Sequence, residues 1–361
     1  MNKFNLTPAS FLVYGISVGT STLIPFNFLD HAQDQGIATI AGGLWSVVLF
    51  YIYTSLLRYG NSEGDFLDLI KNTFSKNLSY IFLIFYSLFI WLAISKDLAI
   101  VWKTISTVIL TKHSPTFVAF LFVLHIFLIC TQGGIKSILQ LSVFYASVCF
   151  VINIIILIMS MNNIEYTNFL PFFYKGVHPF IREFATISGN SSSEIFLLLF
   201  IPEVCKEMRT DIKRFLFPLI FIVATNLIKY TVSLGLLGEY LKYVPTAPGG
   251  AAAGVLTIGT AQIRIEPLVI LAWFITAIIK ISVEYYILSN LAARMVKNSN
   301  MNTFLFPIGI IACCTSLIIF KNQIEVINFT RTYAIYGTLF QFLIPLFFLI
   351  SLKFKRIPAI S

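Results

Sequence analysis

Residues Gly15–Pro25 read GISVGTSTLIP, and this stretch sets the first constraint on the fold. It lies inside residues 7–29, an apolar run that carries no charged residue and is long enough to cross a bilayer. Two glycines, four hydroxyl residues and one proline occur within these eleven residues, and all of them weaken a helix. The pattern therefore predicts a membrane helix that is interrupted near its middle.

An interruption inside a bilayer needs a special environment, because every backbone N–H and C=O there must find a partner. Glycine tolerates an unwound turn, and serine or threonine side chains satisfy the freed backbone groups. The alternative is a packing face, since Gly15 and Gly19 form a G-x-x-x-G pattern. The added hydroxyl run and Pro25 favour the discontinuous helix.

The composition predicts an all-α polytopic membrane protein. Hydrophobic residues make up 57% of the 361 residues, charged residues only 11%, and the mean hydropathy is +0.85. About a quarter of the residues of a soluble domain are charged, and a β-barrel shows alternating segments of about ten residues rather than long apolar runs. We count ten spans, at about 8–28, 37–57, 78–98, 115–132, 138–160, 186–203, 214–238, 267–290, 303–320 and 334–352.

The spans predict a single transmembrane domain over residues 1–361, with two halves at about 8–160 and 186–352. Residues 161–185 contain aromatic, proline and charged residues that are typical of an interfacial segment. Residues 239–266 are rich in proline and glycine, which favours an ordered external loop over a re-entrant piece.

The net charge of +9 does not indicate nucleic acid as a partner. Lys and Arg accumulate in the cytoplasmic loops of membrane proteins. We count the Lys and Arg residues in the loops and tails, taking ten spans and a cytoplasmic N-terminus. Fourteen of them lie on the cytoplasmic side of the membrane and eight on the outer side. This bias predicts that both termini are cytoplasmic.

A second interruption is expected in the sixth span, which opens with residues 188–204, SGNSSSEIFLLLFIPEV. Six polar or glycine residues precede Glu194, and the apolar run between Glu194 and Pro202 is too short to cross a bilayer. Interrupted helices at corresponding places of two halves are the best sequence indication of a transporter-type binding site. We therefore expect the ligand site where spans one and six are broken.

Ionisable residues at membrane depth are costly and are candidates for function. Lys280 and Glu284 lie one helical turn apart, where they either neutralise each other or line a charged cavity. Lys229 lies within the seventh span, where snorkelling is the alternative to a role in a charge network. Lys96 and Asp97 close the third span, which favours an ion pair at the interface over a proton relay.

These patterns give two sets of candidate residues. The intramembrane charge network is predicted to consist of Lys229, Lys280 and Glu284. The ligand-binding candidates are Gly15, Ser17, Gly19, Thr20, Ser21, Tyr86, Ser191, Ser192, Glu194 and Trp273.

Motifs for catalysis or for metal binding do not occur in the sequence. The five cysteines have no C-x-x-C spacing, and no pair of the four histidines has the i,i+4 spacing of a metal site. A phosphate-binding glycine loop and a nucleophile elbow are also missing. We therefore expect neither a cofactor nor a metal, and no enzymatic activity.

The opening of the chain, GISVGTSTLIPFNFLDHAQDQGIATIAGG, resembles the first two spans of the spore germination permeases, the B subunits of GerA-type nutrient receptors. The matching residues are Gly19, Thr20, Pro25, Ala32, Gln33, Asp34 and Gly36. Similar matches follow in order along the chain: NFLPFFYKGVHPFI, the acidic Glu194 in the sixth span, RIEPLVILAWFITAIIKIS, FPIGIIA and IEVINF. One departure is the serine run 191–193, where the family has a glycine shortly before the glutamate.

The resemblance implies a fold and a function. These permeases are similar to the amino acid–polyamine–organocation transporters, with a LeuT-like 5+5 inverted repeat and discontinuous helices one and six. The resemblance implies a receptor subunit in the spore inner membrane that recognises a small nutrient, commonly an amino acid. It implies an A-type membrane subunit and a C-type lipoprotein as partners, and germination with ion release as the response.

Three other functions remain open at this point. An amino-acid permease coupled to protons or sodium shares the fold, and a scaffold subunit would use the same helices only for packing against its partners. An intramembrane enzyme is disfavoured because no nucleophile–base pair can be named.

Overall fold

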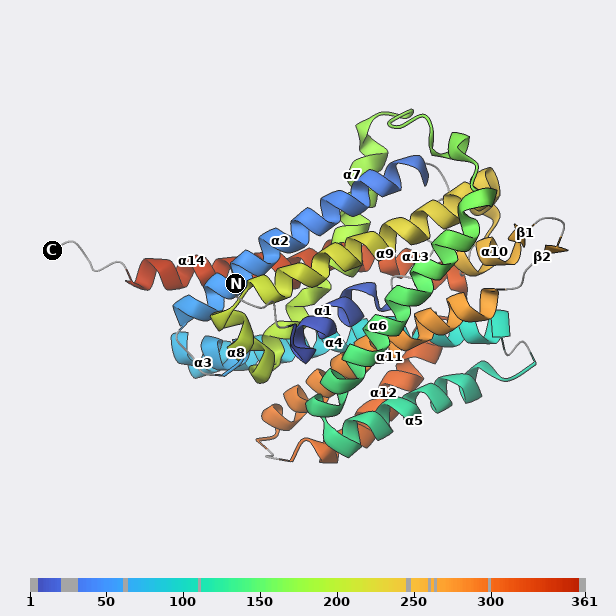
Figure 1. Ribbon diagram of the computed structural model, residues 1–361. Coiled ribbons are helices and arrows are strands. Elements are labelled where there is room, and N and C mark those ends of the chain that lie inside the picture. Colours follow the sequence, from blue (N-terminus) through green and yellow to red (C-terminus); the bar gives the residue numbers. More distant parts are fainter. Residues whose placement is uncertain are drawn as a thin grey trace.

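Long apolar helices make up almost all of the structure (Figure 1). The computed structural model describes residues 6–20, 32–60, 64–109, 112–244, 248–258, 261–262, 265–297 and 300–356. Eight helices of this part of the chain are long and apolar enough to cross a membrane. They are α2 (Gln35–Gly60), α4 (Lys76–Thr104), α5 (Pro115–Gly133), α6 (Ile135–Ser160), α9 (Lys213–Leu237), α11 (Glu266–Met295), α12 (Asn302–Ile319), and α13 (Gln323–Thr338) continued through η9 (Leu339–Leu343) into α14 (Ile344–Arg356).

The first predicted span is short in the structure. Helix α1 (Pro8–Val18) has eleven residues and is about 16 Å long, roughly half the thickness of the hydrocarbon core. It begins at a proline, which is well suited to a first helical turn, and the backbone leaves helical geometry at Gly19. Residues 21–31 lie outside the described residues. The end of α1 at Val18 agrees with the predicted interruption within residues 15–25.

The sixth predicted span is bent. Helix α7 (Val177–Ile187) continues through a π-helical turn, η6 (Ser188–Ser192), into a 3₁₀ segment, η7 (Glu194–Phe200). The whole stretch Val177–Phe200 makes an angle of 103° with α8 (Pro202–Thr210). Pro202 has no N–H to continue the helix, which explains the sharp bend at this point.

The described residues thus contain eight spans, or nine if the bent pair counts as one span, and the predicted number of ten is not confirmed. Two predicted boundaries also differ from the structure. Residues 177–185, expected within the interfacial segment, form the first turns of α7 and run directly into η6. The third span ends at Thr104 rather than at residue 98, and a π-helical turn, η3 (Ile105–Ile109), follows it.

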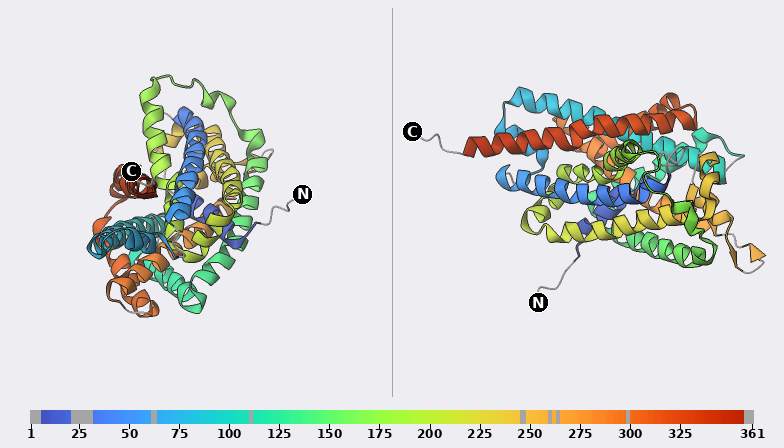
Figure 2. Two further views of the ribbon diagram at one scale, coloured as in Figure 1. Left: turned by 90° about the vertical axis from the view of Figure 1, so that its left-hand side faces the viewer. Right: turned by 90° about the horizontal axis from the view of Figure 1, so that it is seen from above.

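Helix α11 forms the centre of the bundle. In its most apolar stretch 72% of the residues are buried, against 44% or less in the other long helices of the described part. It packs against α1, α4, α5, α6 and α12, while α1 also lies against α6 and α9. The further views show the long helices running side by side, with α14 at the edge (Figure 2). The short α1 therefore ends inside protein.

Short elements cover the two ends of the bundle (Figure 1). Helix α3 (Phe66–Thr73) and α8 lie at one end. Near the other end, residues 239–266 contain α10 (Pro248–Gly254) and a two-stranded antiparallel hairpin of β1 (Thr257–Ile258) and β2 (Ala261–Gln262). The remaining short turns are η2 (Ala32–Asp34), η4 (Met161–Asn163), η5 (Tyr166–Phe169) and η8 (Gly238–Tyr243).

Arg294, in the last turn of α11, connects this helix to α3. Its guanidinium lies 2.6 Å from the carboxylate of Asp65, which is 1% exposed and caps α3. Burial raises the pKa of the Asp65 carboxyl to about 6, although Arg294 opposes the rise. This pKa lies above the ordinary value of 3.8, so Asp65 binds its proton more tightly in the folded chain, and its contribution to stability falls as the pH rises from about 4 to about 6.

Replacing Arg294 by methionine should therefore destabilise the chain in a pH-dependent way. At pH 8 the buried Asp65 carboxylate loses its cation, and we expect the free energy of unfolding to fall by about 1–3 kcal/mol. The deficit should shrink at pH 5, where Asp65 is protonated in both proteins. Unfolding of the purified chain at the two pH values measures this. The control is Arg214→Met, which breaks a pair with Asp211 in which both side chains are more than a third exposed. A deficit of equal size at both pH values would contradict the prediction.

Candidate functional site

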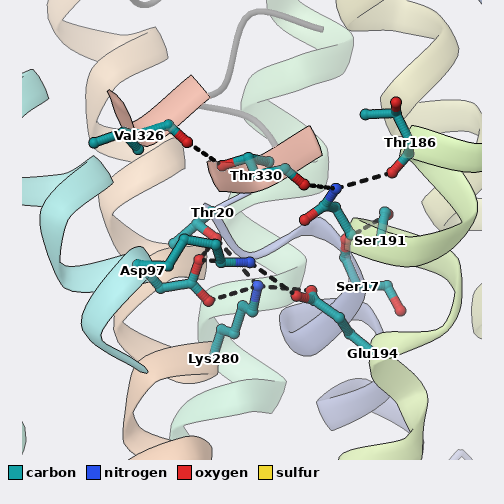
Figure 3. Close-up of polar contacts among 11 residues, drawn as sticks. Ser17, Thr20, Asp97, Thr186, Ser191, Glu194, Lys280, Val326 and Thr330 are labelled. Carbon is teal, nitrogen blue, oxygen red and sulfur yellow. Dashed lines mark hydrogen bonds and ion pairs between the residues drawn. The ribbon is translucent and has the colours of Figure 1, made fainter. Parts of the chain in front are cut away.

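The two interruptions touch each other inside the bundle (Figure 3). The hydroxyl of Ser191 in η6 donates to the carbonyl of Ser17 in α1 at 2.7 Å. The hydroxyl of Thr276 in α11 approaches the carbonyl of Gly19 at 3.2 Å. Both contacts are made to carbonyls at the end of α1, where the last turn of a helix needs acceptor partners from outside it. The hydroxyl-rich sequence thus supplies the donors that an interrupted membrane helix requires.

The glycines of α1 also form a packing face against α11. A Cβ atom at Gly15 would lie 2.6 Å from the side chain of Ile279. A Cβ atom at Gly19 would lie 2.5 Å from the side chain of Lys280. The G-x-x-x-G pattern is therefore both a packing face and part of an interrupted helix. Helix α1 packs closely on α11 and ends where it reaches Lys280.

Neighbouring helices hold η6 in place. The side-chain amide of Asn190 donates to the carbonyls of Thr186 and Thr330, which joins η6 to α13 (Figure 3). From α2, the indole of Trp45 donates to the hydroxyl of Ser193 at 3.1 Å, and the hydroxyl of Ser46 contacts the carbonyl of Ser192 at 3.2 Å. The π-helical turn is therefore fixed from both sides.

A cluster of buried charges lies directly beside this contact. The ammonium of Lys280 on α11 lies 2.7 Å from the carboxylate of Asp97 on α4 and 2.6 Å from the carboxylate of Glu194 on η7. It also donates to the hydroxyl of Thr20 at 3.1 Å, and Thr20 in turn donates to Asp97 at 2.7 Å. Lys280 therefore connects the residues that follow α1 with α4 and η7.

Lys96, the neighbour of Asp97 on α4, is the second cation of the cluster. Its ammonium lies 3.3 Å from Asp97 and 3.5 Å from Glu194. It also lies 4.0 Å from the ring centroid of Tyr333 on α13, in the geometry of a cation–π contact. Both residues are fully buried, although the sequence placed them in an ion pair at the interface. The reason is that α4 continues beyond them to Thr104, so that they lie within the bundle.

Glu284 completes the cluster without pairing with Lys280. One carboxyl oxygen each of Asp97, Glu194 and Glu284 lies within 4.8 Å of the others. The ion pairs of Lys280 are made with Asp97 and Glu194, which are on other elements. The simple neutralisation of Glu284 by Lys280 within one helix is therefore not the arrangement that the structure adopts. We name the group Lys96, Asp97, Glu194, Lys280 and Glu284 the charge cluster.

The other candidate residues are distributed unevenly around this region. The hydroxyl of Tyr86 donates to the carbonyl of Phe340, and its ring packs on Phe66 and Phe200, about 15 Å along α4 from Lys96. Trp273 is buried on α11, two turns before Lys280. Lys229 lies on α9 near Cys149 of α6. Ser192 is part of η6, and Ser21 lies outside the described residues.

Two members of the charge cluster, Lys96 and Asp97, were not among the candidate residues predicted from the sequence. Their signal is present in the sequence, because a Lys–Asp pair follows an apolar run and residues 98–102 are again apolar. Extending the third span by one and a half turns would have placed both residues at membrane depth.

The arrangement suits a small zwitterion. The carbonyls at the end of α1 form the negative end of a helix and favour an amine, and the ammonium groups of Lys96 and Lys280 favour a carboxylate. In this structure the protein's own groups make these contacts with each other. A charged ligand that entered here would compete with these internal contacts.

An apolar cavity of about 290 Å³ lies elsewhere, between α1, α6 and α9. Its lining includes Phe11, Phe150, Pro218 and Phe221. Its lining also includes the hydroxyl residues Ser10, Tyr14 and Ser147 but no charged side chain, so we do not place the polar site there.

Comparison with known proteins places the chain in a family and in a fold. The model of a family described as "Spore germination protein" (Spore_permease) matches residues 4–324. No curated protein matches the chain.

Solved structures of transporters are similar over nearly the whole chain. A Na⁺-coupled sialic acid symporter in a substrate-bound, outward-open state has a TM-score of 0.59 at 13% identity, covering 93% of this chain and 78% of the symporter. A nucleobase-cation-symport-1 family transporter in a closed conformation with bound bromovinylhydantoin has a TM-score of 0.58 at 13% identity, covering 92% of this chain and 75% of the transporter. The predicted LeuT-like transporter fold is confirmed. The family and the fold are those of non-enzymatic membrane proteins, in agreement with the prediction that the chain is not an enzyme.

Proposed function

Because this chain belongs to the family of spore germination proteins, we propose that it is the membrane subunit of a germinant receptor that recognises a small nutrient, an amino acid by class, and helps to trigger germination. It is an integral membrane protein with a permease-like fold. Recognition of a small molecule fits this fold, in which ligands bind at interrupted helices near the membrane midplane.

The observation that carries the proposal is the contact between the two interruptions beside the charge cluster. Ser191 and Ser17 meet at 2.7 Å, and Lys280 lies within 2.7 Å of Asp97 and Glu194. An amino acid carries one ammonium and one carboxylate, so it can exchange with these internal partners without leaving a buried charge unpaired. We propose that Ser17, Gly19, Thr20, Ser191, Ser192 and Glu194 surround the ligand. Gly15 packs on Ile279 of α11, Tyr86 and Trp273 lie farther along α4 and α11, and Ser21 lies outside the described residues.

Partners and orientation follow from the same proposal. We place the chain in the spore inner membrane, in a complex with an A-type membrane subunit and a C-type lipoprotein. Basic residues gather at the end of the bundle that carries α3 and α8. They lie on α3 and α8 and in the last turns of α2 and α11, and they include Arg58, Lys71, Lys206, Arg209 and Arg294. We propose from the positive-inside rule that this end faces the cytoplasm and that both termini are cytoplasmic.

A germination screen tests the proposal. Spores lacking this chain, and the same spores with the chain restored, are exposed to single amino acids, sugars and nucleosides. We expect the response to one or a few amino acids to disappear and to return with the chain. The same compounds should raise the unfolding temperature of the purified chain, since a ligand that binds only the folded state stabilises it. Unchanged responses to every compound, with the chain present at normal level, would contradict the proposal.

A second candidate function is net uptake by an ion-coupled amino-acid permease. The buried charge cluster favours this candidate, because ionisable residues inside membrane bundles commonly mark ion pathways. Vesicles that contain the purified chain distinguish the two functions. Accumulation of the labelled nutrient driven by an imposed proton or sodium gradient would support the permease. Binding without accumulation would support the receptor.

A further inference from the structure

The charge cluster contains one more carboxyl group than ammonium groups. Asp97, Glu194 and Glu284 carry three negative charges if all are ionised, and Lys96 and Lys280 carry two positive charges. All five side chains are at most 1% exposed. An uncompensated charge at such a position costs several kcal/mol, so a further positive charge is required to complete the site.

The contacts show which of the three carboxyl groups lacks its counter-charge. Asp97 and Glu194 each contact both ammonium groups, at 2.6–3.5 Å. One oxygen of Glu284, Oε2, is buried and has no hydrogen-bond partner among the described residues. Within the same part of the chain, no ammonium lies within 4.0 Å of Glu284. Oxygens of two ionised carboxylates, in contrast, lie within 4.8 Å of it.

We propose that Glu284 is a proton-binding site of this chain, and that its side chain is a neutral carboxylic acid whenever the charge cluster is closed. The bound proton brings the net charge of the cluster to zero. When the cluster opens to water, the O–H bond of Glu284 breaks and the proton passes to a water molecule, which leaves a hydrated carboxylate. Proton release is thereby linked to separation of α1 from α4, η7 and α11.

A proton fits the site better than a metal cation does. The ammonium of Lys280 already lies against Asp97 and Glu194, so a metal ion bound by the same three carboxyl groups would be only a few ångströms from this charge. A proton needs no additional space and forms part of Glu284 itself. It also leaves the ion pairs of Lys280 unchanged.

Other titratable groups surround Glu284 from several elements, and they set the charge that it experiences. They are Lys280 on α11, Lys96 and Asp97 on α4, Glu194 on η7 and Tyr333 on α13. The thiol of Cys130 on α5 contacts the carbonyl of Ser282, two residues before Glu284. The two lysines and the two ionised carboxylates balance each other, so Glu284 has no net positive surroundings that would keep it ionised.

Infrared spectroscopy of the full-length chain in lipid vesicles tests the proposal without any nutrient. We expect the C=O stretching band of a protonated carboxylic acid at pH 7 in choline chloride. The band should be lost in Glu284→Gln and retained in the matched control Glu325→Gln, which replaces a partly exposed glutamate at the start of α13. Failure to see the band in the wild-type chain, or its persistence in Glu284→Gln, would overturn the proposal.

Two further measurements complete the test. Replacing choline by sodium or potassium should leave the band unchanged, whereas its loss on adding either ion would show that a metal cation takes the place of the proton. Glutamine mimics a neutral glutamic acid, so Glu284→Gln should unfold at nearly the wild-type temperature at pH 7. Glu194→Gln should unfold at a clearly lower temperature, because it removes a partner of Lys280. The reverse order would contradict a neutral Glu284. These readouts do not depend on the receptor function, so the two proposals fail separately.

Discussion

Replacing Lys280 by methionine should abolish the response to the nutrient and strongly destabilise the chain. Lys280 is the shared partner of Asp97 and Glu194, at 2.7 and 2.6 Å. Without it, Asp97 and Glu194 share the single ammonium of Lys96. Removing one member of a buried ion pair costs about 3–5 kcal/mol. We expect a loss of this size in the free energy of unfolding of the purified chain, and a reduced amount of the chain in spores.

A double variant separates the charge effect from loss of packing. Lys280→Met combined with Asp97→Asn removes one charge of each sign and leaves the pair of Lys96 with Glu194. If the charges are coupled as the distances indicate, the double variant should be more stable than Lys280→Met alone. Lys280→Arg, which keeps the charge, should be the mildest change. A double variant that is less stable by the sum of the two single losses would contradict the coupling.

Replacing Gly19 by alanine should weaken the nutrient response. We expect the nutrient concentration required for germination to rise at least tenfold. The added Cβ would lie 2.5 Å from the Lys280 side chain and 2.9 Å from the carbonyl of Ile16, which is backbone. The Lys280 side chain must therefore shift, and we expect its contacts with Asp97, Glu194 and Thr20 to be disturbed. The dose–response curve of germination, measured with equal amounts of the chain in the spores, records the effect.

Gly15→Ala is the matched control for this prediction. It introduces the same methyl group on the same helix, against the same neighbour α11, at 2.6 Å from Ile279 rather than from Lys280. Overpacking of this kind costs about 1–3 kcal/mol, and both variants should lose stability to a similar degree. Only Gly19→Ala should shift the dose–response curve. A similar shift in both variants would show that the crowding of α1 matters and that the position of Lys280 does not.

The sequence predicted the parts of the fold that depend on local physics. Long apolar runs identified the helices, because about twenty apolar residues are needed to cross a bilayer. The hydroxyl-rich stretches marked the two interruptions, since the backbone at Gly19 and at residues 188–192 requires nearby donors or unusual turns. The family resemblance supplied the transporter fold, and the family match supports it.

The partners of the charged residues were harder to predict. A helical spacing of four favours Lys280 with Glu284, but Lys280 pairs with Asp97 and Glu194, which are separated from it by long stretches of sequence. Such contacts depend on how helices pack, and periodicity along one helix does not contain this information. The sequence placed Lys96 and Asp97 at the interface because an ionised pair favours the end of a span. In the structure, contacts from η7, α11 and α13 compensate the two charges inside the bundle.

The ligand's position, once the screen has identified the nutrient, is the most direct test. Electron cryo-microscopy of the chain with and without this nutrient, bound to an antibody fragment for size, gives a difference map. We expect the added density between Ser17 and Ser191, bordered by Glu194 and Lys280, with the contact of 2.7 Å between the two hydroxyl-bearing residues opened. Density confined to the apolar cavity between α1, α6 and α9, with α1 and η6 still in contact, would contradict the account.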